Sequence, residues 1–271
     1  ICNLRFNSNF LSLFKIIKEG ITGNKDWRPI WRTPDPKKNY DIIIIGGGGH
    51  GLSTAYYLSN VYGIKNVAVI EKGWIGSGNI GRNTTIIRSN YMLPGNEPFY
   101  ELSLKLWEGL EQDFNYNAMI SQRGILNLVH SDGQRDAFAR RGNAMKLAGA
   151  DAELLDEDEV RKICPFLDFD NARFPIKGGL VQKRGGTVRH DAVAWGYARG
   201  ADNQGVDIIQ NCEVTGFKIN NGICSGVETT AGLINAKKIA SCVAGSSSKL
   251  MSLAGIRSVS YTHLTLPTTY G

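Results

Sequence analysis

The feature that most constrains this chain is a glycine-rich turn between an apolar strand and a helix. The β-branched run Tyr40–Gly46 is typical of a strand buried on both faces. The turn Gly46–Gly51 then opens a helix over Leu52–Tyr62, and Asn66–Ile70 predicts a second strand. Strand, turn, helix and strand within about thirty residues make a βαβ unit with a right-handed crossover. An α/β fold on a parallel sheet follows.

The spacing of the glycines indicates a dinucleotide phosphate site. Gly46 permits the tight turn, Gly48 lets the backbone approach a pyrophosphate, and Gly51 lets the helix pack on the strand. The helix N-terminus offers unpaired N–H groups and a positive dipole to the phosphates. Glu71 ends the second strand, where its carboxylate can accept hydrogen bonds from both ribose hydroxyls. The motif predicts binding of FAD or NAD.

The charge distribution narrows the choice of partners. The net charge is +6, but residues 1–40 hold eight Lys/Arg against three Asp/Glu, whereas the rest holds 23 basic and 22 acidic groups. Because the body is neutral, we expect no nucleic-acid partner and interpret 1–40 as a basic N-terminal segment. Its apolar stretch Phe10–Ile17 is too short to cross a bilayer, so we expect no membrane span. We expect this stretch to form an amphipathic helix that docks on the body or on a partner.

Five widely spaced cysteines without a CxxC pair argue against a disulfide scaffold and a zinc site, and favour the cytoplasm. No HExxH or GxSxG motif and no cluster of metal ligands supports hydrolysis or metal catalysis, and we expect no metal site. The stretch from about residue 258 resembles a translated sequencing adapter. We therefore expect 258–271 to be a non-native tail.

The remaining elements follow from hydrophobic periodicity and turn signals. Gly73–Asn90 is expected to be a long loop. The predicted helices are Phe99–Phe114, Asp132–Leu147, Asp156–Ile163 with an Asp156/Glu159 capping box, and Ala192–Ala201 with Asp191 as its N-cap. The predicted strands are Gly124–Val129, Val206–Ile209, Glu213–Ile219, Gly226–Thr230 and Lys237–Val243.

Several stretches resemble a known family, among them YDIIIIGGGGHGLSTAYYL, NVAVIEKGWIGSGNIGRNTTIIRSNY and RHDAVAWGYARGADNQGVDIIQNCEVTGF. They are similar to the β subunits of heterotetrameric sarcosine oxidases, which are D-amino-acid-oxidase-like flavoenzymes. The resemblance runs from about Trp27 to Ile256. It implies a Rossmann-like FAD-binding domain (41–97 and 186–257) with an inserted α+β substrate domain (98–185), both incomplete here.

The resemblance also implies which residues contact a noncovalent FAD. The positions implied for the pyrophosphate and the adenosine ribose are Gly46, Gly48, Gly49, His50, Gly51 and Glu71. Those implied along the flavin are Asn79, Arg82, Thr84, Thr85 and Ile86, and Val214 is implied at the adenine. Ala244 and Gly245 match a strand end that abuts the cofactor.

His190 is the most specific of the implied positions. From the residues alone, a histidine just before a helix is usually a satisfied surface residue. The match of Arg189-His190-Asp191 to the family motif instead implies covalent attachment of FMN through His190. Arg82 and Arg88 are candidate anion contacts, with a surface role for Arg88 left open. His130 is expected to be structural.

The implied activity is that of a β-type subunit that oxidises the secondary amine sarcosine to glycine. Electrons would pass from FAD to covalent FMN and then to oxygen, in a complex with the other sarcosine oxidase subunits. Two alternatives stay open: a single-chain FAD-dependent amine or amino-acid oxidase or dehydrogenase, and a non-catalytic flavin-binding electron-transfer subunit. The sequence does not indicate a catalytic residue.

Overall fold

The computed structural model describes residues 13–23, 25, 31–91 and 95–258. Its main sheet has six strands in the order β8-β2-β1-β11-β10-β9. These are β1 (Asn39–Ile45), β2 (Val67–Ile70), β8 (Asp207–Ile209), β9 (Val214–Asn220), β10 (Ile223–Thr229) and β11 (Gly232–Ser241). Strands β8, β2, β1 and β11 run parallel to one another. Strand β10 pairs antiparallel with β11, and β9 pairs antiparallel with β10. The predicted parallel sheet and its βαβ unit are confirmed.

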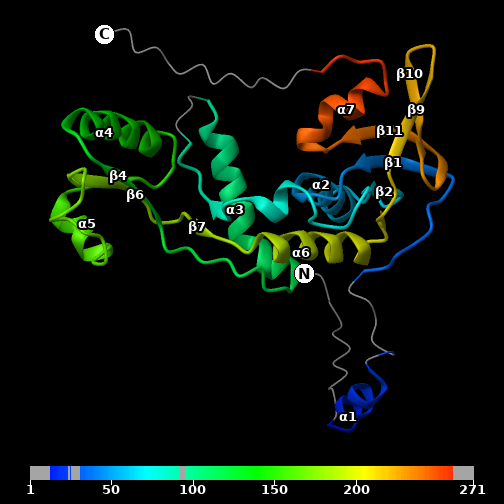
Figure 1. Cartoon of the computed structure of the whole chain (residues 1–271), viewed down its shortest axis with the longest axis horizontal. Coiled ribbons are helices and arrows are strands. Elements are labelled where there is room, and N and C mark those ends of the chain that lie inside the picture. Colours follow the sequence, from blue (N-terminus) through cyan, green and yellow to red (C-terminus); the bar gives the residue numbers. More distant parts are fainter. Residues whose placement is uncertain (1–12, 24, 26–30, 92–94, 259–271) are drawn as a thin grey trace.

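Strand β1 is buried on both faces, as its unbroken apolar run predicts. Ile44 belongs to the apolar cluster on one face, and Ile43 and Ile45 belong to the cluster on the other, because successive strand residues point to opposite sides. The helices that pack on the first face are α2 (Gly49–Asn60), α3 (Glu97–Phe114) and α6 (His190–Asn203). Helix α7 (Ser247–Ser252) covers the second face through Leu250 (Figure 1).

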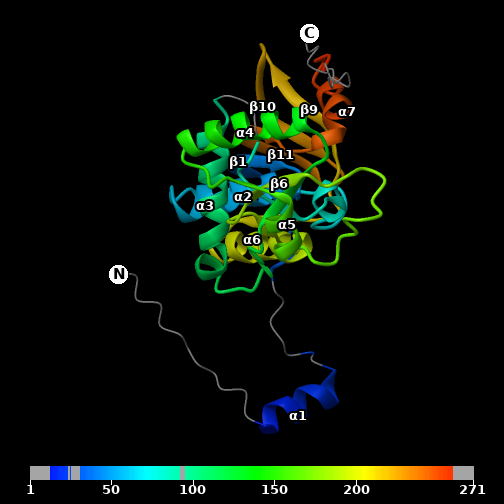
Figure 2. The same ribbon diagram turned by 90° about the vertical axis from the view of Figure 1, so that its left-hand side faces the viewer.

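A second, antiparallel sheet lies at the other end of the molecule from the β9–β10 hairpin (Figure 1). Its strands are β4 (Ile125–Val129), β6 (Gly178–Gln182) and β5 (Glu153–Leu155), in the order β4-β6-β5. Helices α4 (Asp132–Leu147) and α5 (Glu157–Ile163) cover it, as the end-on view in Figure 2 shows. Leu180 belongs to an apolar cluster with Met145 of α4, and Val181 belongs to another with Val160 of α5, so both faces of β6 are buried.

Short elements link the two sheets and flank them. Strands β3 (Ile86–Ile87) and β7 (Gly186–Thr187) pair antiparallel between the sheets. Single turns of 3₁₀ helix lie at η1 (Asn79–Arg82) and η2 (Ala244–Ser246). Helix α1 (Leu13–Thr22) presents exposed apolar side chains, including Phe14 and Ile21. Among the described residues, no helix is long and apolar enough to cross a membrane.

The expectations from periodicity are largely confirmed, but one N-cap is wrong, four short strands are missed, and β10 and β11 begin earlier than Gly226 and Lys237, where they were predicted to begin. Helix α4 has its predicted bounds, and the capping box of Asp156 and Glu159 is present. Asp191 as an N-cap is wrong. Helix α6 begins at His190 with Arg189 in the N-cap position, so Asp191 lies inside the first turn, where its carboxylate pairs with the Arg189 guanidinium at 2.8 Å. The short strands β3, β5, β6 and β7 were not predicted.

Two predictions about organisation stay open. The predicted domain boundaries remain a prediction: the three-stranded sheet lies within 98–185, whereas α3, from the same range, packs on the main sheet through Leu110 and Phe114. The expected non-native tail lies, from residue 259 onward, outside the described residues.

Candidate flavin-binding site

A single open cavity of about 1260 Å³ collects the predicted site residues. All of them except Gly51 line it, although they come from distant parts of the chain: the β1–α2 turn, the end of β2, the η1–β3 loop, the start of α6 and the start of β9. The cavity exceeds the usual range of about 300–1,000 Å³ for small-ligand pockets, and so suits an extended cofactor.

The glycine turn is shaped by close backbone contacts. Gly46 has a φ of +113°, and a Cβ there would lie 2.5 Å from the carbonyl oxygen of Cys242, the residue that follows β11. A Cβ on Gly51 would overlap the carbonyl oxygen of Gly46. At Gly48, in contrast, a Cβ would have no atom within 4 Å. The two outer glycines therefore serve the fold, whereas Gly48 keeps the space in front of the turn open.

The N-terminus of α2 faces this open space. No side chain caps the helix at Gly48, so its first N–H groups and its positive dipole end are available to an anion. Gly49 and His50 also line the cavity. His50 is exposed, and its carbonyl accepts hydrogen bonds from the hydroxyls of Ser53 and Thr54 within the helix.

Glu71 is held in a fixed orientation beside the turn. One carboxylate oxygen accepts the Gly47 N–H at 2.8 Å and the other accepts the Gly73 N–H at 2.9 Å. Each carboxylate oxygen has a second lone pair, which leaves acceptor capacity on the cavity side. The Glu71 main chain extends the ladder from β2 toward β8 by bonding to Ile209 and Cys212. A preoriented carboxylate with free lone pairs suits the two hydroxyls of a ribose.

The loop after Glu71 lines the cavity in a constrained conformation. Asn79 and Arg82 lie on η1, Thr84 and Thr85 follow, and Ile86 is in β3. Thr85 has a φ of +63°, which is uncommon for a β-branched residue and is typical of functional sites. Its N–H donates to the side chain of Asn83 at 2.7 Å, and its carbonyl accepts the N–H of Val188 at 2.9 Å. The second bond ties this loop to the chain just before His190.

His190 lies on the same cavity. It is half-buried at the first position of α6, and its buried Nδ1 has no hydrogen-bond partner among the described residues. Beside it, the hydrogen bond from Arg189 lowers the pKa of Asp191. The His190 side chain therefore lines the cavity, and its buried Nδ1 is not held by a hydrogen bond from the described part of the chain.

The comparison with protein families follows this geometry. The family described as FAD dependent oxidoreductase matches residues 41–271. The chain belongs to this family. The fold agrees, because L-proline dehydrogenase from P. horikoshii superimposes with a TM-score of 0.77 at 26% identity over 83% of this chain and 58% of that one.

Three curated relatives are named "Sarcosine oxidase subunit beta". The protein from Rhizobium meliloti (strain 1021) is 70% identical over 246 residues, which is 91% of this chain and 59% of the relative. The protein from Arthrobacter sp is 52% identical over 83% of this chain and 56% of the relative. This FAD-dependent oxidoreductase chain thus spans less than two thirds of the length of the curated relatives it matches.

Val214, predicted to lie at the adenine, lines the cavity together with Ala244 and Gly245, which are predicted to abut the cofactor. At its rim the Lys249 ammonium approaches the Glu213 carboxylate at 3.4 Å. Cys242 also lines the wall here, and burial raises the pKa of its thiol. These residues therefore line the same cavity as the glycine turn and the loop that carries Thr84 and Thr85.

The sequence analysis missed an aromatic wall at the start of α3. Tyr91 stacks on Tyr100 with ring centroids 4.0 Å apart, and Trp107 lies further along the same cavity side. The spacing of Tyr100, Ser103 and Trp107 places them on one helix face and could have indicated this wall. Arg88 is not among the lining residues, and its guanidinium covers the Tyr91 ring at 4.6 Å.

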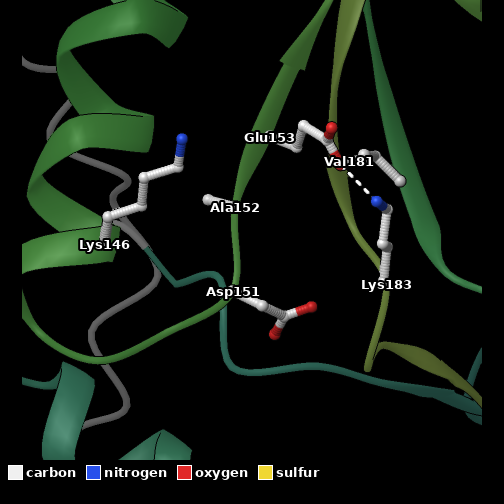
Figure 3. Close-up of a pocket in the computed structure, with 6 residues that line it drawn as sticks. All are labelled: Lys146, Asp151, Ala152, Glu153, Val181 and Lys183. Carbon is white, nitrogen blue, oxygen red and sulfur yellow. Dashed lines mark ion pairs between the residues drawn. The ribbon is translucent and has the colours of Figure 1, made fainter.

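A smaller hollow of about 380 Å³ lies beside β5 and β6 (Figure 3). Its Lys183 ammonium is paired with Glu153 at 2.5 Å, and its Asp151 carboxylate accepts from Gln182 and Arg184, so most of its charge is used within the protein. His130, expected to be structural, has its Nδ1 3.0 Å from the Pro175 carbonyl. In the described part of the chain, no group of three or more His, Cys, Asp or Glu could hold a metal ion.

Proposed function

We propose that this chain is the FAD-binding part of a β-type subunit of a sarcosine oxidase that works with other subunits and oxidises sarcosine to glycine. The observation that carries the proposal is the open space at Gly48, which lies between a helix N-terminus and the preoriented Glu71 carboxylate. The name of the relatives at 70% and 52% identity supports the choice of substrate and partners.

The residues of this chain would bind and orient the cofactor. The N–H groups at the start of α2 would hold the FAD pyrophosphate, and Glu71 would hold the ribose hydroxyls. The loop that carries Thr84, Thr85 and Ile86 would lie along the flavin, with Val214 near the adenine. Bound FAD would supply the redox chemistry by accepting a hydride from the carbon next to the amine nitrogen.

We further propose that His190 carries a covalent FMN, from which electrons pass to oxygen. The position of the half-buried imidazole on the cavity wall supports this assignment, and its buried Nδ1 makes no hydrogen bond that would fix the ring in another orientation. A cytoplasmic location is proposed as well. Cys164, Cys212, Cys224 and Cys242 are free thiols, which suits a reducing compartment.

The experiment is made on the full-length subunit, assembled with its partners and denatured in acid. We expect flavin to remain with the precipitated chain, to be lost in His190→Asn, and to be retained in the control His130→Asn. The intact complex is expected to oxidise sarcosine and release hydrogen peroxide. Covalent flavin that persists in His190→Asn would disprove the attachment, and sarcosine oxidation without any covalent flavin would favour a single-flavin oxidase or dehydrogenase.

A further inference from the structure

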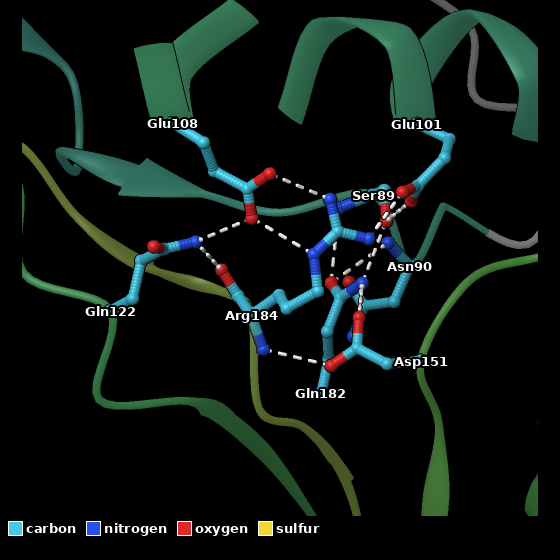
Figure 4. A network of polar contacts seen from close by, with 8 residues as sticks. All are labelled: Ser89, Asn90, Glu101, Glu108, Gln122, Asp151, Gln182 and Arg184. Carbon is cyan, nitrogen blue, oxygen red and sulfur yellow. Dashed lines mark hydrogen bonds and ion pairs between the residues drawn. The ribbon is translucent and has the colours of Figure 1, made fainter. Parts of the chain in front are cut away.

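A buried polar cluster lies next to the aromatic wall of the cavity (Figure 4). Its side chains come from the segment after β3, from α3, from the α3–β4 connection, from the α4–β5 connection, from the end of β6 and from the β6–β7 connection. They are Ser89, Asn90, Glu101, Glu108, Gln122, Asp151, Gln182 and Arg184. These residues are outside the cavity lining, and the side chain at the centre, Gln182, is fully buried.

The Gln182 amide uses its full hydrogen-bonding capacity. Its Oε1 accepts the main-chain N–H groups of Ser89 at 3.0 Å and Asn90 at 3.2 Å. Its Nε2 donates to the Ser89 hydroxyl at 2.6 Å and to the Asp151 carboxylate at 3.0 Å. Two acceptor sites and two donors are all that a primary amide has. Any apolar replacement would leave buried groups on the partner segment unpaired, which is costly.

The position of Tyr91 depends on the hydrogen bonds of the Gln182 amide to Ser89 and Asn90, which we call the clamp. The Asn90 side chain has no hydrogen-bond partner among the described residues, so Gln182 holds this segment through its two main-chain N–H groups and through the Ser89 hydroxyl. The Tyr91 N–H donates to the Ser89 carbonyl at 2.8 Å, which makes a tight turn and transmits the position of Ser89 to Tyr91. The Tyr91 ring in turn lines the cavity and stacks on Tyr100.

The same cluster fixes the connection that leads to His190. Arg184 follows Gln182 and binds Glu108 with two bonds of 2.8 and 2.9 Å, and it also pairs with Glu101. From there the chain enters β7, which pairs with β3, and continues to His190. Because β3 and β7 meet, the Tyr91 segment and the His190 segment form neighbouring parts of one wall.

We propose that Gln182 is a positioning residue for substrate recognition: it acts through Ser89–Asn90 and sets the place of Tyr91 at the flavin end of the cavity, without touching the substrate. The inference rests on the proposed function for the identity of the substrate, a small secondary amine. It concerns a part of the cavity wall that is distinct from the cradle for the FAD pyrophosphate.

The test compares matched variants of the full-length subunit in its assembled complex. Gln182→Met removes all four hydrogen bonds of the amide while the side chain keeps a similar size. The control Gln122→Met removes two side-chain bonds in the same cluster, to Glu108 and to the Arg184 carbonyl, without touching Ser89 or Asn90. The pair Gln182→Glu with Asp151→Asn exchanges donor and acceptor between positions 182 and 151 at constant charge, so it serves as a rescue of either single change.

In Gln182→Met we expect hydrogen exchange at the Ser89 and Asn90 amides to accelerate at least about tenfold, because both lose their acceptor. The KM for sarcosine is expected to rise by at least about tenfold while the FAD content stays at the wild-type level, since a small misplacement of a positioning group has large kinetic effects. Gln122→Met should change neither quantity. The exchanged pair should bring the KM closer to wild type than Gln182→Glu or Asp151→Asn alone, because it re-forms the bond between positions 182 and 151.

Unchanged exchange at Ser89 and Asn90 in Gln182→Met, or an equal rise of KM in Gln122→Met, would overturn the inference. A paired variant no better than its single changes would do the same. The proposed function fails separately, if the wild-type complex binds no FAD or oxidises no amine. In that event the exchange at Ser89 and Asn90 still decides whether Gln182 positions the wall.

Discussion

The turn Gly46–Gly51 is made from six consecutive residues, whereas the clamp on Ser89 and Asn90 joins side chains up to 93 positions apart. In the turn, backbone atoms fit against one another so closely that only glycine is accommodated at Gly46 and Gly51. In the clamp, directed hydrogen bonds of side chains hold a segment that has no regular structure. The shape of the cavity at the Gly46–Gly51 turn therefore depends on steric fit, whereas its shape at Tyr91 depends on hydrogen bonds between side chains and the Ser89–Asn90 segment.

This difference teaches where each region is vulnerable. At Gly46 and Gly51 the turn fails when any atom is added, regardless of polarity, because the neighbouring atoms are backbone and cannot move aside. A polar clamp tolerates changes of shape better than the loss of one partner, since an unpaired buried group costs more than the bond itself contributes.

The largest effect is expected for Gly51→Ala, because the new methyl group would overlap the carbonyl oxygen of Gly46. We expect a loss of about 3 kcal/mol or more in the free energy of unfolding, at the upper end of the cost of overpacking. Urea denaturation of the full-length protein measures it. A loss below about 1 kcal/mol would mean that the turn adapts and is not fixed by steric fit.

Arg184→Met should come next, because it leaves the Glu101 carboxylate without its guanidinium partner. We expect a loss of about 2–3 kcal/mol, less than for a fully enclosed pair because the Arg184 side chain is 33% exposed. Arg161→Met, which removes an exposed guanidinium from two exposed carboxylates, is the matched control and should change stability little. Equal losses in the two variants would refute the special role of the cluster.

The effect of Arg184→Met on the free energy of unfolding is expected to depend on pH. The hydrogen bond from Arg184 lowers the pKa of Glu108 in the folded protein. A carboxyl with a lowered folded pKa stabilises the fold above its unfolded pKa, and this contribution is lost as pH falls through the folded value. The gap in unfolding free energy between wild type and Arg184→Met should therefore narrow as pH is lowered from 7 to below about 4. A gap that stays constant would contradict this.

Glu71→Gln should weaken FAD binding at the steric end of the cavity. The amide keeps the shape but loses the charge and one acceptor beside the Gly47 and Gly73 N–H groups. We expect a loss of about 1.5 kcal/mol or more, at least about tenfold in the FAD dissociation constant. Fluorescence titration measures it, with the exposed Glu228→Gln on β10 as the control. An unchanged constant would remove Glu71 from the site.

The smallest effect is expected for Asp191→Asn. Its carboxylate is paired with an exposed guanidinium at the start of α6, and such surface pairs are screened by salt. We expect a slight fall in thermal stability at low ionic strength that disappears at high salt. A large, salt-independent fall would show that the start of α6 depends on directed bonds, as the clamp does.

The sequence predicts the elements whose causes are local. The βαβ unit, the bounds of α4 and the capping box of α5 depend on residues a few positions apart, so periodicity and turn chemistry suffice. The error at Asp191 is also instructive, because capping statistics do not register that Arg189 competes for the same carboxylate.

The sequence does not predict the parts that depend on distant partners. Strand β6 begins with Gly178 and Gly179, which suggest a turn, yet it forms the centre of the second sheet. Nothing near Gln182 in the sequence indicates that its amide holds Ser89 and Asn90. The implied positions of Thr85, Val214 and His190 came from family resemblance, and only folding brings them to one cavity.

The central claim, that the β1–α2 turn holds the FAD pyrophosphate, is tested most directly by the FAD content of Gly48→Val. A Cβ at Gly48 would meet no protein atom within 4 Å, and Gly133 on α4 is matched in this respect. We predict that Gly48→Val purifies with a wild-type circular dichroism spectrum but without FAD, whereas Gly133→Val retains it. A folded Gly48→Val protein with wild-type FAD content would contradict the account.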